Sequence, residues 1–358
     1  MLAAIAAVPL LAVLVRCSPR LGWLDVPVAR SAHRVPVPRA GGLGIIGAIV
    51  IAAIAGPSWW SASQWIGLGL LAVVGFADDI WNLPATPRLL THLAAAALLV
   101  SGHAGEGGWL WQALGVLWIA AFINAFNFMD GIDGIAGLHA GVAGGMWFAA
   151  GLTTDVPALA AAGGAVAGAS VAFLRVNWAP ARIFMGDAGA TFLGAALASM
   201  PWVTPTPERW FAPAVVVLAP FWFDAGVTLL GRMRQGAVLY AGHQEHFYQR
   251  LVNAGLRHAT VATGYGVMTA IAGAGALAAP RVRGPQALAS VAVVVLGMAA
   301  CALGLKRAAR DASERTPRRS TDNSGPRPSS ERPGHASAGR MPSPRDYSPS
   351  DSAAQARS

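Results

Sequence analysis

Blocks of apolar residues, each roughly 15–21 residues long, recur along this chain as far as residue 305. Each block is close to the ~20 residues that a helix needs to cross the hydrocarbon core of a bilayer. Charged residues make up only 12% of the 358 residues, whereas soluble proteins carry about 25%. A segment in lipid must satisfy its own backbone hydrogen bonds, as a helix does. The sequence therefore predicts an all-α, polytopic integral membrane protein.

Hydropathy places about 10–11 transmembrane helices along the chain. The first block lacks a positively charged leader, and Arg16 stands where a signal-peptide cleavage site would lie, so we expect a retained first span. Several blocks are short, which leaves ten spans as an alternative to eleven. The expected spans are residues 1–15, 41–56, 60–77, 88–101, 109–126, 135–151, 157–174, 188–202, 211–230, 260–280 and 286–305.

Arginine is unevenly distributed between the loops on the two sides of these spans. Twelve Arg fall in one set of loops, and three (Arg209, Arg281 and Arg283) fall in the other. Lys and Arg favour cytoplasmic loops, so the arginine-rich set is expected in the cytoplasm. That set comprises residues 16–40, 78–88, 175–187 and 231–259.

The composition changes abruptly at Lys306. Residues 306–358 contain no Leu, Ile, Val, Phe or Trp and carry eleven basic and six acidic residues among many Pro and Ser. Such a segment cannot bury a core, so we expect a membrane domain at 1–305 and a disordered, basic, cytoplasmic tail at 306–358. The tail is either simply solvated or attracted to anionic lipid. Because the tail and the loops account for the basic balance, no nucleic acid is expected as a partner.

Acidic residues before the tail number only eleven, and eight of them fall at or near the predicted cytoplasmic ends of spans. Carboxylates beside a bilayer need partners such as Arg or a metal ion, so these residues predict one polar site at the inner face. Among them, the adjacent Asp78 and Asp79 end a span, where they either need a cation or cap the next element. The eight are Asp25, Asp78, Asp79, Asp130, Asp133, Asp187, Asp224 and Glu245.

Three further segments carry polar side chains on the same side. Asn124, Asn127, Asp130 and Asp133 recur every third residue, and glycines 131 and 134 predict a break in the helix there. Asp187 stands where a span begins, so it is suited equally to capping that helix and to binding Mg²⁺. The longest internal cytoplasmic loop holds His243, His246 and Arg250, which are either solvated or face a phosphate.

Acids, amides, histidines and arginines at one membrane face suit Mg²⁺-dependent chemistry on a diphosphate. Magnesium takes one or two carboxylates and completes its shell with phosphate oxygens and water. Phosphoryl transfer depends mainly on alignment and charge neutralisation, which such a cluster supplies. A site against the bilayer also implies that one reactant is bound in lipid.

These segments, in this order, resemble the polyprenyl-phosphate N-acetylhexosamine-1-phosphate transferase family, glycosyltransferase family 4, over about residues 20–255. The histidine segment is closer to the O-antigen-initiating branch than to the peptidoglycan branch, which carries a denser run of histidines. The matching motifs are Phe76-Ala77-Asp78-Asp79, the segment Asn124–Gly137, Phe184-Met185-Gly186-Asp187-Ala188-Gly189 and His243-Gln244-Glu245-His246-Phe247-Tyr248-Gln249.

The resemblance implies an activity. Undecaprenyl phosphate attacks a UDP-N-acetylhexosamine, giving a lipid diphosphate sugar and UMP, which starts an O-antigen-like polysaccharide at the bacterial plasma (inner) membrane. It also implies Mg²⁺ (Mn²⁺ as the alternative) and a homodimer. By motif position, the roles are catalytic for Asp78, Asp79, Asp130, His243 and His246, substrate-binding for Asn124, Asp133, Asn177, Phe184 and Arg250, and metal-binding for Asp187 and Asn127.

The chain departs from the family pattern at two points. Ala190 replaces the serine that follows the Gly-Asp-x-Gly motif, and Lys306 is the only lysine, so Arg39 or Arg88 would replace the lysines usual near these motifs. The alternatives are a peptidoglycan phospho-N-acetylmuramoyl-pentapeptide transferase, a cation-coupled transporter and an inactive scaffold. The sugar, and whether attack is direct or through a covalent intermediate, are left open by the sequence.

Overall fold

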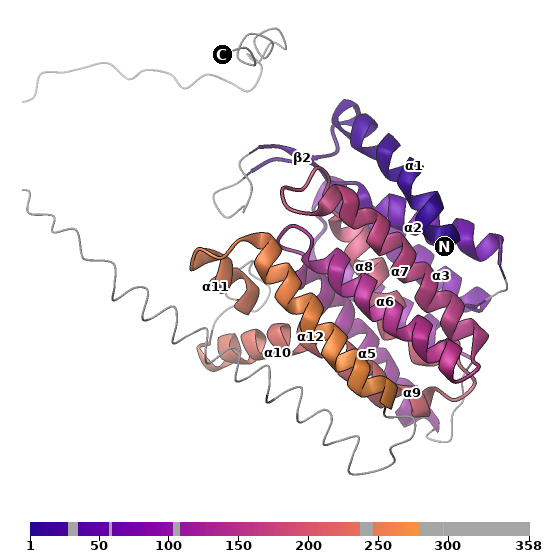
Figure 1. Cartoon of the computed structure of the whole chain (residues 1–358). Helices are drawn as coiled ribbons and strands as arrows, with labels where there is room; N and C mark the ends of the chain where they lie inside the picture. Colours follow the sequence, from indigo (N-terminus) through magenta and orange to yellow (C-terminus); the bar gives the residue numbers. More distant parts are fainter. Residues whose placement is uncertain (28–34, 57–58, 103–107, 237–245, 279–295, 297–358) are drawn as a thin grey trace, which may run out of the picture. The chain divides into compact units, whose positions relative to one another are not determined.

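The computed structural model describes residues 1–27, 35–56, 59–102, 108–236, 246–278 and 296, all within one compact unit, residues 1–313 (Figure 1). His243, the tail 306–358 and, except for Leu296, the expected span 286–305 lie outside the described residues. The described helices are α1 (Leu2–Cys17), α2 (Gly41–Ile54), α3 (Ala62–Trp81), α4 (Ala85–Val100), α5 (Gly108–Met129), α6 (Ile135–Thr153), α7 (Pro157–Asn177), α8 (Gly186–Ala198), α9 (Pro207–Val217), α10 (Ala219–Arg234), α11 (Phe247–Asn253) and α12 (His258–Ala278).

The prediction of an all-α, polytopic membrane protein is confirmed. In the described part of the chain, five helices are long and apolar enough to cross a membrane, or six if α9 and α10 form one broken span. The helices α2 and α4 are apolar but shorter. So five or six of the ten or eleven expected spans are identified by length and composition. Apart from 211–230 and from 188–202, which runs over α8 and a short 3-10 helix (Met200–Val203), each expected span up to 260–280 coincides with one helix.

The expected span 211–230 is not one continuous helix. The chain bends by 69° between α9, which ends at Val217, and α10, which begins at Ala219. Pro220 occupies the first turn of α10. A proline has no backbone N–H and cannot continue the hydrogen bonds of a preceding helix, but it is tolerated in the first turn of a new one. The proline therefore marks the start of a second helix.

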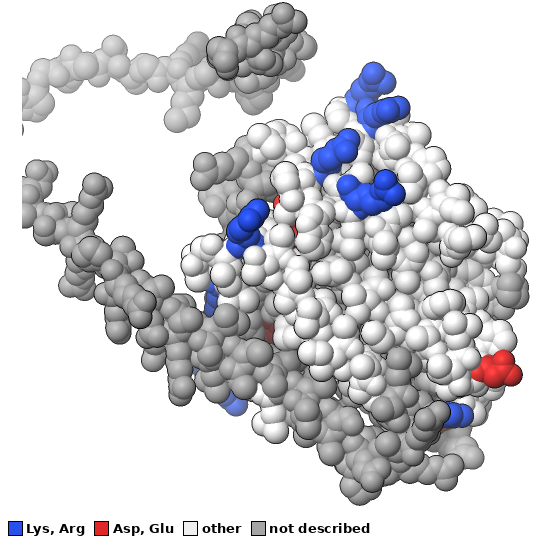
Figure 2. Space-filling view, viewed as in Figure 1, with Lys and Arg blue, Asp and Glu red and all other residues white. Residues whose placement is uncertain are grey.

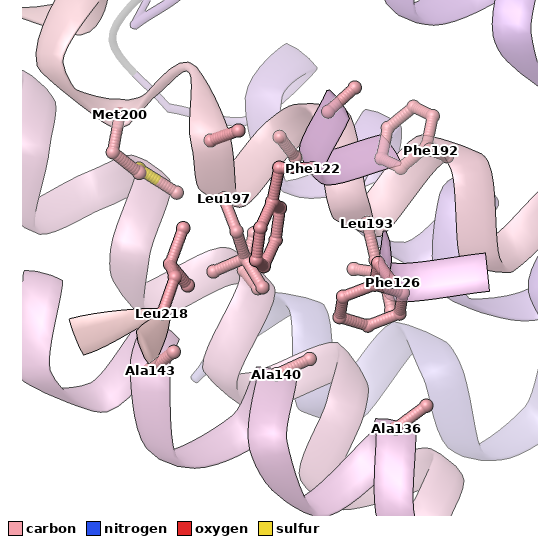
Figure 3. Close-up of a cluster of buried hydrophobic side chains, with 14 of the residues drawn as sticks. Phe122, Phe126, Ala136, Ala140, Ala143, Phe192, Leu193, Leu197, Met200 and Leu218 are labelled. Atoms are coloured by element: carbon pink, nitrogen blue, oxygen red, sulfur yellow. The ribbon is translucent and has the colours of Figure 1, made fainter. Parts of the chain in front are cut away.

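The helix α8 lies in the core of the described unit. Every residue from Ala188 to Ala198 is buried, and α8 packs against α2, α3 and α5. Figure 3 shows Phe192, Leu193 and Leu197 of α8 beside Phe122 and Phe126 of α5. Because α8 is rich in glycine and alanine, neighbouring helices approach it closely from several sides.

The start of α8 is fixed by contacts between glycines. A side chain at Gly42 of α2 would meet the backbone of Gly189, and one at Gly75 of α3 would lie 2.7 Å from the Cα of Ala188. Such close approach of helix backbones is possible only with small residues at the crossing. As a result α2 and α3 both contact the turn of α8 that carries Asp187.

Two short strands precede α2. Strand β1 (Leu24–Asp25) pairs antiparallel with β2 (Val37–Pro38). The chain leaves β2 toward α2 and runs beside residues 184–185, to which it is joined by backbone hydrogen bonds: Phe184 N donates to Pro38 O (2.7 Å), and Gly41 N donates to Phe184 O (2.9 Å). Arg39 is thereby held next to the start of α8.

Candidate active site

Asp79, at the end of α3, caps α8. Its Oδ1 accepts a hydrogen bond from Asp187 N (2.8 Å), and its Oδ2 accepts one from Ala188 N (3.2 Å). The first N–H groups of a helix have no partner within that helix, and a carboxylate there also interacts favourably with the helix dipole. Arg39 Nε completes the arrangement at 3.0 Å from Asp79 Oδ1. Asp79 therefore joins α3, α8 and the segment after β2.

Of the two roles predicted for Asp187, capping α8 and binding Mg²⁺, the structure excludes the first. The carboxyl group of Asp187 makes no cap hydrogen bond in α8, since Asp79 supplies the acceptor. Instead it contacts the carboxyl group of Asp78 and lies 3.9 Å from Arg39 Nη2. Its side chain keeps 21% of its exposure, against 5% for Asp79. Asp187 is the more accessible of these two carboxylates.

Asp78 is fixed by the turn that follows α3. Its Oδ1 accepts a hydrogen bond from Leu83 N (2.6 Å), and its Oδ2 forms an ion pair with Arg88 Nη1 (2.9 Å) at the start of α4. Asp78 thus fixes the turn that leads to α4, whereas Asp79 caps α8, a helix much further along the chain. They also lie together beside Asp187, as the convergence hypothesis expected.

The polar row of α5 ends in the predicted break. The helix α5 stops at Met129 and α6 begins at Ile135, with Gly134 at a φ of +81°, a conformation that favours glycine. Asp130 follows α5 directly. Burial and then the nearby carboxylates of Asp187 and Asp79 raise the pKa of Asp130 well above its usual range. Asp130 therefore belongs to the same group of acids.

Asn177, for which the resemblance implies nucleotide binding, joins two loops in this structure. Its side chain is buried; Oδ1 accepts a hydrogen bond from Gly134 N (3.0 Å), and Nδ2 donates one to Ile183 O (2.9 Å). Both polar ends of the amide are thus bonded to backbone groups. Asn177 fixes the loop after α5 against the segment that carries Phe184, which is half-buried.

Asp133 lies at the outer side of the same loop. Its Oδ2 accepts a hydrogen bond from Ala181 N (3.2 Å) and lies 3.4 Å from His258 Nδ1 at the start of α12. His258 was not expected at the site. The signal that could have found it is weak, because a single histidine 125 positions downstream of Asp133 has no local motif around it. Only the fold brings the two side chains together.

The remaining predicted residues lie on α5 and α11. Asn124 Nδ2 contacts His92 Nδ1 of α4 (3.1 Å), and the half-buried Asn127 lies one turn further along α5. His246 is buried at the start of α11, whereas Arg250 of the same helix is exposed. The carboxylates thus lie together, whereas Arg250 and His246 differ in exposure although they belong to one segment.

The carboxylates are suited to a Mg²⁺ ion whose remaining ligands would be substrate phosphate oxygens and water. In the described ranges, no three His, Cys, Asp or Glu side chains form a metal site by themselves. Magnesium, however, needs only one or two carboxylates when phosphate oxygens and water fill its shell. Asp187 and Asp78 meet carboxyl to carboxyl, an arrangement that like charges disfavour unless a proton or cation lies between them. The donor set is therefore of the right kind for a hard divalent cation.

The surface around the site matches its position at a membrane face. On the side of the molecule shown in Figure 2, the flanks of the helices are uncharged, and most basic side chains gather at the end near β2. Apolar side chains such as Val73, Leu117 and Ile271 are exposed on the helices. Exposed apolar flanks with a charged end are what a bilayer requires of a spanning protein.

Replacing Asn177 by Ala is expected to lower the unfolding free energy by about 1–3 kcal/mol, because a buried N–H and a buried C=O lose their partner. It should also weaken nucleotide-sugar binding, since the loops of Asp133 and Phe184 are no longer joined. Thermal unfolding in detergent and UDP-sugar binding measure the two effects. The control is Ser170→Ala on the same helix, because the buried Ser170 hydroxyl has no hydrogen-bond partner among the described residues. Equal behaviour of the two variants would contradict the role given to Asn177.

Comparisons with known proteins agree with the resemblance. The family described as glycosyl transferase family 4 matches residues 61–204, which include all the clustered carboxylates. A probable undecaprenyl-phosphate N-acetylglucosaminyl 1-phosphate transferase of Bacillus subtilis is 29% identical over 68% of this chain and 73% of that protein. The decaprenyl-phosphate N-acetylglucosaminephosphotransferase of Mycobacterium tuberculosis is 31% identical over 68% and 72%, respectively. A phospho-N-acetylmuramoyl-pentapeptide-transferase of Latilactobacillus sakei is 30% identical over 47% of this chain and 62% of that protein.

Proposed function

Because the chain belongs to glycosyl transferase family 4, we propose that it transfers an N-acetylhexosamine 1-phosphate from a UDP-sugar to undecaprenyl phosphate. The products are a lipid diphosphate sugar and UMP. The observation that carries the proposal is the meeting of Asp78, Asp79 and Asp187 with Arg39 at one end of a bundle of apolar helices, with Asp130 near enough to interact electrostatically. Such a site combines charge neutralisation for a diphosphate with access to a lipid-bound reactant.

In this proposal the acids have different roles. Asp187, with Asn127 and the adjacent Asp78, would hold Mg²⁺ or Mn²⁺, which when bound supplies positive charge to the phosphate oxygens. Asp79 orients the start of α8 and neutralises Arg39. Asp133 and Phe184 would face the nucleotide. A phosphate monoester is already largely dianionic at pH 7, so the lipid phosphate needs little help from a base.

N-acetylglucosamine is the sugar that we propose to test first. The Bacillus subtilis and Mycobacterium tuberculosis relatives are named for it, and each is matched over 68% of this chain. The muramoyl-pentapeptide relative is matched over 47%. We propose that the product starts a cell-surface polysaccharide, of the O-antigen type or a wall polymer, and that the site faces the cytoplasm, as the arginine distribution indicates. The homodimer stays a prediction.

A donor panel tests the proposed function. Membranes containing the protein should release UMP from UDP-N-acetylglucosamine only when undecaprenyl phosphate and Mg²⁺ are both added, with an equal amount of lipid-linked sugar formed. The panel includes UDP-N-acetylgalactosamine and UDP-N-acetylmuramoyl-pentapeptide, and membranes without the protein are the control. Release from the pentapeptide donor alone would assign the chain to the peptidoglycan reaction. Absence of lipid product with every donor would refute the transferase.

A further inference from the structure

Asp224 is a buried carboxylate in α10 that no motif singled out. It is 1% exposed, and its two oxygens accept hydrogen bonds from five donors. A buried charge is tolerated only when its hydrogen-bonding capacity is filled in this way. The donors to Oδ1 are Phe247 N (2.9 Å), His246 Nδ1 (3.3 Å) and Thr228 Oγ1 (3.3 Å), and those to Oδ2 are Tyr265 Oη (2.5 Å) and Tyr248 N (3.2 Å).

Three of these bonds fix the start of α11. The N–H groups of Phe247 and Tyr248 belong to its first turn and have no acceptor within the helix. Asp224 supplies that acceptor from a neighbouring helix, in the way that Asp79 does for α8. The bond between Asp224 Oδ1 and His246 Nδ1 fixes the orientation of the imidazole. The end of the predicted histidine segment is therefore attached to α10.

The same helix reaches the carboxylate cluster through Tyr248. The Tyr248 hydroxyl donates to Phe128 O (2.9 Å), and a side chain on Gly131 would collide with that hydroxyl. Phe128 and Gly131 flank Asp130, one of the clustered acids. Asp224 therefore fixes α11 on one side, and α11 packs against the Asp130 loop on the other.

We infer that Asp224 is a positioning residue, which holds His246 and α11 against the Asp130 loop during transfer. This inference rests on the proposed function. A purely local role would make Asp224 one more buried group whose loss lowers stability and nothing else. The positioning role adds that its loss slows the chemical step more than it weakens donor binding, because none of the described residues that donate to Asp224 is one to which nucleotide binding is assigned.

Hydrogen exchange resolved to single residues tests whether Asp224 holds the start of α11, first in the wild-type protein and then in a variant. In the wild-type protein the amides of Phe247 and Tyr248 should exchange slowly, like those of Asp187 and Ala188, which Asp79 caps. In Asp224→Asn the first pair should exchange at least about tenfold faster while the second pair is unchanged, since an amide in place of the carboxylate presents an NH₂ group to one of the N–H donors. Fast exchange of Phe247 and Tyr248 in the wild type would overturn the inference even if the variant fails to fold.

Steady-state kinetics test whether the loss of Asp224 slows the chemical step. Asp224→Asn should lower kcat about 10- to 100-fold, the cost of a small displacement of catalytic groups, with the KM for the UDP-sugar within about threefold of wild type. The matched controls are Thr228→Val and Tyr265→Phe, which each remove one donor and keep the carboxylate, and their kcat should stay within about threefold.

An unchanged kcat in Asp224→Asn would overturn the inference, whether or not exchange becomes faster. So would equal losses in Asp224→Asn and both controls. If wild-type membranes release no UMP from any donor, the proposed function fails, and the exchange experiment still decides whether Asp224 holds α11.

Discussion

Replacing Asp187 by Asn is expected to lower UMP release about a hundred- to a thousandfold, the range for removing one group that stabilises a transition-state charge. Asp187 makes no cap for α8, because Asp79 accepts the hydrogen bonds from its first turn. Its carboxylate instead meets Asp78 and Arg39 with part of its surface exposed. The change should therefore remove activity while the amount of protein in the membrane stays the same.

The measurement is UMP release and lipid product per amount of membrane-inserted protein, over a range of Mg²⁺ concentrations. Asp155→Asn is the matched control, because Asp155 is exposed in the turn between α6 and α7, and asparagine tolerates its φ of +54°. That control should keep wild-type activity. If Asp187→Asn also keeps it, Asp187 has no part in binding a metal ion or a diphosphate.

Replacing Gly42 by Val is expected to lower both stability and turnover. A side chain there meets the backbone of Gly189 and lies 2.7 Å from Met185 O, neither of which can move without moving α8. Overpacking of this kind costs about 1–3 kcal/mol. A displacement of α8 by about 1 Å would carry Asp187 with it and can slow the reaction a further hundredfold.

Thermal unfolding in detergent and UMP release at a permissive temperature measure the two effects of Gly42→Val separately. Gly69→Ala on α3 is the control, because a side chain at Gly69 meets nothing within 4 Å, and alanine favours the helix. It should equal or exceed the wild type in stability. A Gly42→Val protein with normal unfolding and normal turnover would show that α2 and α8 are not in contact at this position.

Much of the fold follows from local features of the sequence. Apolar blocks of membrane length locate the helices, and glycines 131 and 134 locate the break after α5. The bend between α9 and α10 was missed because hydropathy averages over Pro220, whose effect is on the backbone rather than on polarity. Convergence of the acids was also predictable, since the sequence places them at or near the ends of spans on one predicted side.

The partners within the site were not predictable. Asp79 caps a helix that begins 107 residues later, at Gly186, and the oxygens of Asp224 accept from α11 and α12. A motif records which residues occur together, but a hydrogen bond across helices depends on their packing, which no short segment specifies. Asn177 illustrates the difference, because its motif does not indicate that its amide is bonded to two loops.

The enclosure of α8 bears on how this protein responds to its membrane. With 13 residues, α8 is about 20 Å long, too short to match a hydrocarbon core of about 30 Å. Because it is buried from Ala188 to Ala198, changes in bilayer thickness act on the tilt of the outer helices and reach this part of α8 only through protein contacts. The geometry at Asp187 is therefore insulated from lipid composition, and a transferase built in this way can keep its activity across membranes of different thickness.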